Sequence, residues 1–360
     1  MTINVAIIGC GRMARHHLDG IERAKARVTW VSDLRPEAAA ELAKRTGAKV
    51  AAHYRDALAD PAVQAVCVTT ITSGHKQACL DAIAAGKAVI CEKTLTEDPA
   101  DSWMVVRAAE AAGTPLFVDY MKRFLPAVEK AKELMPAIGR IITTHVRCWQ
   151  PWGDLWTEMP KDGACHTPPG GTSEVVRNNG GGVLMCGGSH AIDLTLHLLG
   201  RPSRVYAHVD ILPGRDYDVH AGAMLATANG PVHLSVVAHP HGRFGYERDG
   251  WDERIEILGT HGRLEICCPI WDQGSSKASL LIHDAADGTR TEHRCAAVSP
   301  FALSVSAFCA AIASGRQDLQ SRMTGYEADE VLHAITRSGR EQRPVDIAWR
   351  DTTKSAGVAR

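Results

Sequence analysis

A glycine-rich turn is the first segment whose residue types and spacing could do chemistry. Gly9 and Gly11 follow the apolar run Ile3–Ile8 directly, Ala14 stands three residues later, and a helical pattern comes next. In such a strand–turn–helix unit the first glycine allows a tight turn, and the second lets the backbone approach a pyrophosphate. The small third residue lets the helix pack closely on the strand. The pattern therefore predicts a dinucleotide site with its phosphates at a helix N-terminus.

An acidic residue after the next strand supports this interpretation. Val28–Val31 reads as that strand, and Asp33 follows it at roughly the 20-residue spacing expected for the acid that binds the adenosine ribose. A carboxylate there would repel the 2′-phosphate of NADP, which favours NAD. Arg35 lies close by and would attract that phosphate, so NADP stays open. The alternative is that Asp33 only caps the following helix.

The elements that must position this site alternate along the first third of the chain. Short apolar segments that read as strands are followed by segments that read as helices. The later strands are Val63–Val68, Ala88–Cys91 and Leu116–Val118, and the helices are Pro36–Thr46, His75–Ala85 and 98–113. This alternation predicts a parallel, doubly wound sheet, whose ligands bind beyond the carboxyl ends of the strands. Lys93 stands at the carboxyl end of the strand Ala88–Cys91, at the edge where a nicotinamide ring is expected.

The bulk composition limits the fold and the partners. At 360 residues, 45% of them hydrophobic and 22% charged, the chain has the size and composition of a soluble two-domain enzyme. We expect a dinucleotide-binding domain over residues 1–122 and a substrate-binding and oligomerisation domain over residues 123–360. The net charge of −1 gives no overall attraction to nucleic acid or to an acidic membrane.

Targeting signals and cysteine usage favour the cytoplasm. The N-terminus has neither the basic start nor the apolar stretch of a signal peptide, and no apolar run approaches the roughly 18–20 residues of a membrane span. The 11 cysteines include no paired Cys-x-x-Cys units, which fits reduced thiols better than a disulfide framework. We therefore expect a cytoplasmic protein with a small-molecule substrate, without nucleic-acid or membrane partners and without a metal.

Five motifs occur in the order in which one enzyme family carries them. They are the loop 69–75 (Thr-Thr-Ile-Thr-Ser-Gly-His), the triplet 92–94 (Glu-Lys-Thr), the crossover 120–126, the segment 180–193 and the late segment 246–262. Together they resemble the glucose-fructose oxidoreductase/inositol dehydrogenase/MocA (Gfo/Idh/MocA) family over nearly the whole chain. Each motif alone is weak, but five in the family's order are specific.

The resemblance implies a fold and an activity. The fold is a Rossmann domain followed by an α/β domain with a large, mostly antiparallel open sheet, through which family members often form dimers or tetramers. The activity is NAD(P)-dependent hydride transfer at a secondary hydroxyl of a sugar, cyclitol or related polyol. The later sequence agrees in outline, because several segments read as strands and two as helices. The strands are Ile141–Val146, Val205–Ile211, His220–Ala226, Val232–Ala238 and Arg254–Leu258, and the helices are Phe301–Ala313 and Glu327–Arg337.

Such a reaction needs two catalytic groups. A base must take the hydroxyl proton, and histidine suits this task because its pKa lies near the working pH. A second group must stabilise the developing alkoxide, and a lysine near the nicotinamide ring can do so. By resemblance, His190 is the family's catalytic histidine, and Lys93 hydrogen-bonds the reacting hydroxyl and takes part in a proton relay. The alternatives are a core histidine and a surface lysine.

The other site residues follow from their places in the motifs. We expect cofactor contacts from the glycine turn, its partner acid and two loops: Gly9, Gly11, Arg12, Met13, Asp33, Thr70, His75, Glu92 and Lys93. We expect substrate contacts from Lys93, Tyr120, Arg123, Trp152, Arg177, Cys186, His190 and Asp193. Tyr120 and Arg123 could equally pack at the domain interface, and Asp193 could instead orient His190.

One position departs from the family pattern Asp-x-Gly-x-His. Position 186 is a cysteine, and a thiol neither raises the basicity of His190 nor binds a substrate hydroxyl as a carboxylate does. The departure leaves open an NAD-dependent glycosidase or lyase that uses transient oxidation, and a non-catalytic dinucleotide-sensing regulator. Cys186 and His190 could also hold a metal with Cys165 and His166, which their spacing does not favour.

The segment 149–179 is rich in aromatic residues. Trp149, Trp152 and Trp156 lie close together and are followed by Pro- and Gly-rich sequence. Sugar rings stack on aromatic faces, so such a loop over the pocket suits a carbohydrate, whereas the alternative is a subunit contact. A second polar and aromatic patch could receive an anionic substrate together with Arg177; it consists of His239, His241, Arg243 and Trp251.

Overall fold

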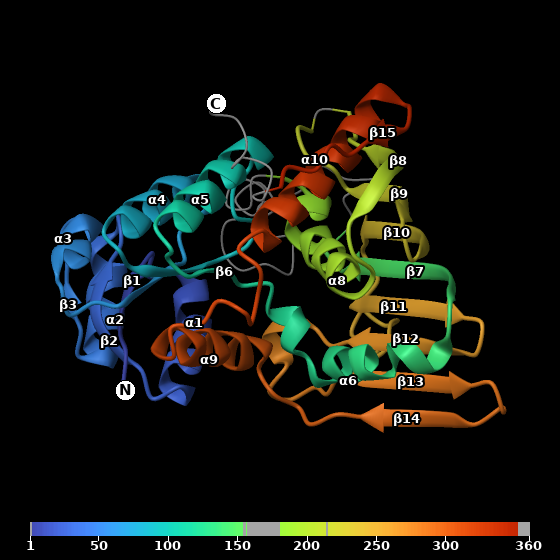
Figure 1. Cartoon of the computed structure of the whole chain (residues 1–360), viewed down its shortest axis with the longest axis horizontal. Coiled ribbons are helices and arrows are strands. Elements are labelled where there is room, and N and C mark those ends of the chain that lie inside the picture. Colours follow the sequence, from blue (N-terminus) through green and yellow to red (C-terminus); the bar gives the residue numbers. More distant parts are fainter. Residues whose placement is uncertain (1, 154–155, 157–180, 214, 352–360) are drawn as a thin grey trace, which may run out of the picture.

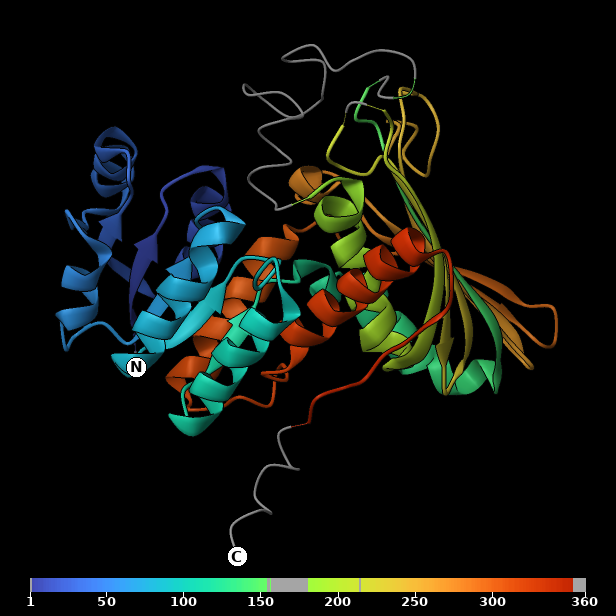
Figure 2. The same cartoon turned by 90° about the horizontal axis from the view of Figure 1, so that it is seen from above.

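The computed structural model describes residues 2–153, 156, 181–213 and 215–351. Two sheets organise this part of the chain (Figure 1). A six-stranded sheet comes from the N-terminal third, and a nine-stranded sheet from residues 141–346. Seen from above, helices lie between the two sheets, and the nine-stranded sheet forms one outer side of the molecule (Figure 2).

The six-stranded sheet is parallel throughout, with the order β3-β2-β1-β4-β5-β6. Its strands are β1 Asn4–Ile8, β2 Arg27–Ser32, β3 Lys49–Val50, β4 Ala65–Val68, β5 Ala88–Cys91 and β6 Leu116–Val118. The connecting helices are α1 Arg12–Arg23, α2 Pro36–Thr46, α3 Tyr54–Ala59, α4 His75–Ala84 and α5 Pro99–Ala111. The predicted parallel, doubly wound sheet is confirmed. Its strand order reverses between β1 and β4, which places a ligand at their carboxyl ends.

A helix from late in the sequence completes the N-terminal half. Helix α9, Pro300–Ala313, packs against α1 and the face of the six-stranded sheet that α1 covers (Figure 1). Phe308 stacks on Phe117 of β6 with ring centroids 4.8 Å apart, and Val305 packs so closely on Gly20 of α1 that a side chain at Gly20 would overlap it. The chain therefore returns to the first sheet after building the second.

The second sheet is antiparallel except between β7 and β10, so the predicted mostly antiparallel open sheet is confirmed. Its order is β14-β13-β12-β11-β7-β10-β9-β8-β15. The strands are β7 Ile141–Gln150, β8 Pro202–Asp210, β9 His220–Thr227, β10 Gly230–Ala238, β11 Asp252–Gly259, β12 Gly262–Cys268, β13 Leu280–Ala285, β14 Arg290–Arg294 and β15 Val345–Asp346.

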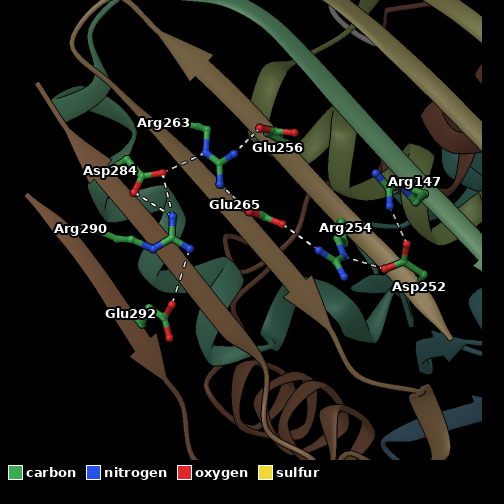
Figure 3. A network of polar contacts seen from close by, with 9 residues as sticks. All are labelled: Arg147, Asp252, Arg254, Glu256, Arg263, Glu265, Asp284, Arg290 and Glu292. Atoms are coloured by element: carbon green, nitrogen blue, oxygen red, sulfur yellow. Dashed lines mark hydrogen bonds and ion pairs between the residues drawn. The ribbon is translucent and has the colours of Figure 1, made fainter. Parts of the chain in front are cut away.

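In the described part of the chain, helices cover the inner face of this sheet. They are α6 Pro126–Leu134, α8 Ser189–Leu199 and α10 Thr324–Glu341 (Figure 2). Buried and less buried side chains alternate along β7 and β10, as expected for strands with one covered face. The outer face carries a ladder of alternating arginine and acidic side chains (Figure 3). Arg254 joins Asp252 to Glu265, and Arg263 joins Glu265 to Glu256.

Several elements were not predicted, for physical reasons. β3 and α3 are too short to show a periodic pattern, and β15 has two residues. α6 was missed although Pro126 is a typical first residue of a helix. The late segment 246–262 is not itself a strand pair. The hairpin is β11–β12, which begins at Asp252, turns at residues 260–261 and continues to Cys268.

Two further properties concern the described residues only. No helix among them is long and apolar enough to cross a membrane. The ten cysteines in this part of the chain are all free thiols, most of them buried.

A buried carboxyl group between the two halves predicts how stability changes with pH. The Asp329 carboxyl of α10 accepts hydrogen bonds from Ser102 Oγ (2.6 Å) and Thr96 N (3.1 Å), and burial raises its pKa to about 7. The unfolded value is about 3.9, so between about pH 4 and 7 the folded state keeps a proton that the unfolded state loses. The free energy of unfolding therefore falls as the pH rises through this window.

We expect Asp329→Asn to flatten that dependence. Relative to wild type, the variant gains on the order of 2–4 kcal/mol of stability between pH 5 and pH 8, because asparagine cannot ionise. Urea unfolding at the two pH values measures the change. Asp98→Asn, which alters an exposed helix cap, is the control and leaves the slope unchanged. If the free energy of unfolding had the same pH slope in Asp329→Asn and in wild type, Asp329 would not be the group responsible.

Candidate active site

The turn between β1 and α1 has the geometry of a pyrophosphate cradle. Gly9 has a φ of 91°, and a Cβ there would lie 2.7 Å from backbone atoms of Thr69 and Thr70. Gly11 caps α1 without a side chain, and a Cβ there would meet only the Arg35 guanidinium, 4.0 Å away. The first amides of α1 therefore face open space at the positive end of a helix, which fits the phosphates of a dinucleotide.

Asp33 lies beside this turn and is held by backbone amides. Its Oδ2 accepts a hydrogen bond from Cys10 N at 2.6 Å, and its Oδ1 accepts one from Arg35 N at 2.8 Å. The Arg35 guanidinium lies 3.5 Å from the same carboxylate and is largely exposed. An acid that favours ribose hydroxyls and a cation that could bind a 2′-phosphate thus share one corner of the site.

This arrangement predicts the outcome of Asp33→Asn. Asparagine keeps an acceptor for the Cys10 amide but removes the repulsion of the 2′-phosphate. We expect the affinity ratio of NADPH to NADH to rise by about tenfold or more, the effect of one charge at a partly exposed site. Fluorescence titration of both reduced cofactors measures it. Adding Arg35→Ala should reverse the gain, and an unchanged ratio in Asp33→Asn would rule out the role.

His75 joins the two loops that follow β4 and β5. Its Nδ1 lies 2.8 Å from the carbonyl oxygen of Thr94, and its Nε2 lies 3.2 Å from that of Thr70. The ring is buried, and burial lowers its pKa. Thr69 ties the first loop to the glycine turn, because its hydroxyl donates to Gly9 O at 2.6 Å. His75 therefore holds loops in place through their backbones.

Lys93 reaches from the first sheet to the glycine-rich segment of the second half. Its Nζ donates a hydrogen bond to the carbonyl oxygen of Cys186 at 3.0 Å, and the hydroxyl of Ser189 donates to the same oxygen at 3.2 Å. Cys186 lies in a π-helical turn, Leu184–Gly188, that leads directly into α8. Turns of this kind are frequent at functional sites because they redirect side chains.

His190 stands in the first turn of α8, four residues after Cys186. Its ring is buried and meets the ring of Tyr120 edge-on, with centroids 5.9 Å apart. Among the described residues, its Nδ1 has no hydrogen-bond partner. Burial lowers the pKa of His190 well below its usual value, and the charges of Lys122 and Lys93 lower it further. The imidazole is therefore neutral near pH 7 and able to accept a proton.

Close backbone packing fixes the π-helical turn. A side chain at Gly187 would overlap Gln150 of β7, and one at Gly182 would overlap the backbone of Asp218. The Asp218 carboxylate accepts a hydrogen bond from Leu184 N at 2.7 Å. These contacts set where Cys186 and His190 lie relative to the second sheet.

Known proteins share both halves of this arrangement. A family model described as "Oxidoreductase family, NAD-binding Rossmann fold" matches residues 3–120, and one described as "GFO/IDH/MocA C-terminal domain" matches residues 128–265. A relative named inositol 2-dehydrogenase 2, from Saccharopolyspora erythraea, is 34% identical over 279 residues, which are 75% of this chain and 74% of that protein. The chain belongs to the Gfo/Idh/MocA family of oxidoreductases.

Other Gfo/Idh/MocA-like proteins match over the full length. Inositol 2-dehydrogenase 1 of the same organism is 27% identical over 363 residues, 98% of each chain. A structure of levoglucosan dehydrogenase in complex with NADH and levoglucosan superposes with a TM-score of 0.80 at 23% identity, covering 97% of this chain and 100% of that one. The expected family, fold and NAD-binding Rossmann domain are thereby confirmed.

Within this Gfo/Idh/MocA fold, two residues expected to contact substrate contact each other. Arg123 donates two hydrogen bonds to the Asp193 carboxylate, Nε to Oδ2 at 2.8 Å and Nη2 to Oδ1 at 2.6 Å. Burial raises the pKa of Asp193 to about 6 in spite of Arg123. Asp193 is almost fully buried, so the pair joins the crossover to α8, the helix that carries His190.

The structure places the other expected residues as follows. Tyr120 is fully buried against His190, and Trp152 is buried with its Nε1 donating to Gln150 Oε1 at 2.9 Å. Glu92 is turned into the interior of the first half, away from the open end of the sheet. Arg12 is exposed, with its guanidinium 4.7 Å from the Trp271 ring centroid. Met13 lies in the first turn of α1, and Arg177, like Cys165 and His166, falls outside the described residues.

A buried polar network behind the site was not predicted. Lys122 forms an ion pair with Glu253 of β11, and Gln150 donates to Glu253 Oε1 at 2.9 Å. Cys148 Sγ also lies 3.3 Å from that oxygen. The network lies under Gly187 and so supports the turn of Cys186. Lys122, which stands between Met121 and Arg123 in the crossover, is the sequence signal that could have indicated it.

Proposed function

We propose that this chain is an NAD(P)-dependent dehydrogenase that acts on a secondary hydroxyl group of a cyclitol, a sugar or a related polyol. One observation carries the proposal. Lys93 from the NAD-binding half bonds the Cys186 carbonyl in the turn that leads to His190, and burial, together with the charges of Lys122 and Lys93, lowers the pKa of His190. The turn of Cys186 thus links a lysine at the carboxyl edge of the first sheet, where a nicotinamide ring is expected, to the helix that carries a neutral imidazole.

The residues divide the chemistry between them. A bound nicotinamide supplies the hydride acceptor for the alcohol carbon. The glycine turn and Asp33 would hold its dinucleotide. Lys93 would donate a hydrogen bond to the reacting oxygen and stabilise negative charge as it develops. His190, neutral because it is buried, would take the hydroxyl proton. The relatives named as inositol 2-dehydrogenases and levoglucosan dehydrogenase support the choice of substrate class.

A panel assay tests this function. The purified protein is mixed with NAD or NADP and with inositols, levoglucosan, aldoses and uronates, and the absorbance of the reduced nicotinamide is followed. We expect turnover with at least one cyclitol or sugar, and a rate lower by about 100-fold or more with Lys93→Ala at the same protein concentration. Silence of the wild-type protein across the panel with both cofactors would overturn the proposal.

Cys186 favours a second candidate, a glycosidase or lyase that oxidises its substrate only transiently. Without a carboxylate at that position, the site has one proton acceptor fewer for net alcohol oxidation. This candidate predicts that NAD stays bound through purification and that glycosides are cleaved without net NADH. Mass spectrometry of the protein's copurified ligand, together with product analysis on natural glycosides, distinguishes it from the dehydrogenase.

The same residue predicts a change in pH dependence. Because the pKa of His190 is lowered, the acid limb of the kcat/KM profile of the wild type lies below the usual histidine range, about 6.5. A carboxylate at position 186 would favour the imidazolium form, so we expect Cys186→Asp to move this limb to higher pH. Cys186→Ala, the matched control, should keep the wild-type limb and most of the activity. A loss of activity in Cys186→Ala would instead indicate thiol or metal chemistry.

We also propose that copies of the chain associate through the outer face of the nine-stranded sheet. The ladder drawn in Figure 3 contains both signs of charge in alternation, which suits a two-fold contact between identical faces. Arg263→Glu would place three acids around a reversed charge, since Arg263 bonds Glu256, Glu265 and Asp284. Light scattering after size exclusion should show a smaller species for this variant, and an unchanged mass would exclude this face.

A further inference from the structure

A buried cluster of three ionisable side chains lies under the catalytic edge of the first sheet. His17 of α1, Glu92 after β5 and Asp119 after β6 are each almost completely buried. His17 Nε2 lies 2.8 Å from Glu92 Oε1 and 3.3 Å from Asp119 Oδ2. The second oxygen of Glu92, Oε2, accepts a hydrogen bond from the backbone N–H of Lys93 at 3.2 Å.

We propose that His17, with Asp119 beside it, is a positioning residue that holds the Glu92 carboxylate and thereby fixes the backbone from which Lys93 reaches the reacting oxygen. The proposal deepens the dehydrogenase function above and rests on Lys93 being catalytic. The proposal adds His17 and Asp119 to the residues that support Lys93, although no sequence motif connects them with Glu92. Glu92 acts through Lys93 and is expected to touch neither substrate nor cofactor.

The charges within the cluster are consistent with this role. Burial alone would lower the pKa of His17, but its contacts with Cys67, Glu92 and Asp119 raise it well above its usual value. Burial alone would raise the pKa of Glu92, but the hydrogen bond and charge of His17 lower it. The two therefore form a charged pair near neutral pH, and removing one partner leaves a buried charge uncompensated.

Every element around His17 contributes a facing group. Cys67 comes from β4, Glu92 from the end of β5, Asp119 from the end of β6, and Ser304 of α9 lies against Asp119. His75 and Lys93 face Glu92 from the other side. Burial raises the pKa of Asp119 to about 7, so its carboxyl is the group that titrates near physiological pH.

The cluster also joins Lys93 to the cofactor turn. α1 begins at Arg12, directly after Gly11, and carries His17 on its second turn. The three side chains also lie within the spacing of a metal site. The 2.8 Å separation of His17 Nε2 and Glu92 Oε1 is that of a direct hydrogen bond, which an ion between them would not allow.

Charge-balanced variants test the positioning role. His17→Gln and Glu92→Gln each leave one buried charge without its partner, and the double variant replaces the ion pair by two amides that can bond each other. We expect each single variant to lower kcat about 10-fold, with little change in the dissociation constant of NADH. We expect the double variant to recover most of the loss, because the two residues act as one unit.

Val305→Ala is the matched control for destabilisation. Val305 of α9 is buried and packs on Gly20 of helix α1, which also carries His17, but it has no polar group. It should lower the melting temperature as the His17 variants do while leaving kcat within about twofold, since kinetic losses require loss of a transition-state contact. If Val305→Ala lost as much kcat as His17→Gln, His17 would act only as a core residue, and the proposal would be overturned.

Amide hydrogen exchange gives a readout that needs no substrate. In the NAD-loaded protein, peptides covering residues 92–96 should exchange about 10-fold faster in His17→Gln than in wild type, as expected for local opening. They should be protected again in the double variant, and Val305→Ala should match wild type. Protected peptides in His17→Gln overturn the positioning role even if the protein turns over no sugar. If the 92–96 peptides exchange faster in His17→Gln but the wild-type protein turns over no sugar, the result would count against the dehydrogenase function alone.

Discussion

Replacing Lys93 by alanine should lower kcat by about 100-fold or more, and replacing His190 should do the same, the usual scale for the loss of acid–base assistance. The two side chains come from different halves of the fold and meet through the turn of Cys186. If they serve one proton relay, the double variant should be hardly slower than either single variant, because residues that act as a unit show large coupling.

Binding measurements separate this loss from a loss of cofactor. The glycine turn and Asp33 lie apart from both residues, so the dissociation constant of NADH should change little in each variant. Lys76→Ala removes a half-exposed lysine of α4 that pairs with Asp101, and it should keep wild-type kinetics. Full activity in His190→Ala would refute the shared relay. So would a loss of kcat in the double variant that equals the product of the losses in the two single variants.

Breaking the Arg123–Asp193 pair should give the largest loss of stability. Arg123→Leu leaves the Asp193 carboxylate buried without a partner, which typically costs about 3–5 kcal/mol. Replacing both residues, by Arg123→Leu with Asp193→Leu, removes both charges and should recover most of that loss. Urea unfolding of the two single variants and the double variant measures the coupling energy between the two residues. Additive losses of unfolding free energy would show that breaking the pair is not the cause of the destabilisation.

The sign of the pH dependence gives this prediction a second check. Burial already raises the pKa of Asp193 to about 6, above the unfolded value of about 3.9. Without Arg123 the folded pKa rises further, so the free energy of unfolding of Arg123→Leu keeps falling above about pH 6, where this contribution levels off in the wild type. The deficit against wild type should therefore be smaller at pH 5 than at pH 8. A deficit that grows on acidification would contradict this reasoning.

The sequence predicted those parts of the molecule that depend on short-range patterns. Val63–Val68, Ala88–Cys91 and the glycine turn are local signals, because a strand's apolar run or a turn's glycines are set by neighbouring residues. The helices α9 and α10 were also recognised, with α10 extending three residues earlier and four later than expected. Such end effects are ordinary, because helix ends depend on caps and tertiary contacts.

Contacts between distant residues could not be predicted in the same way. Nothing near Asp193 indicates that Arg123, 70 residues earlier, takes both of its oxygens. The ion pair of Lys122 with Glu253 joins the crossover to β11, 131 residues later in the chain. His17 is the instructive exception. It lies three residues after Ala14 and four before Ile21, so helical spacing alone places it on the buried face of α1.

The return of α9 to the first sheet has a consequence for synthesis on the ribosome. A nascent chain that ends before α9 lacks the helix that covers Phe117 and the buried face of α1. The dinucleotide-binding half therefore cannot close its core cotranslationally when its own strands emerge, unlike a domain that folds from a continuous stretch. Its completion waits for residues 300–313 to leave the exit tunnel, after the nine-stranded sheet has nearly all been made. Until then, the apolar face left bare is a natural binding site for a nascent-chain chaperone.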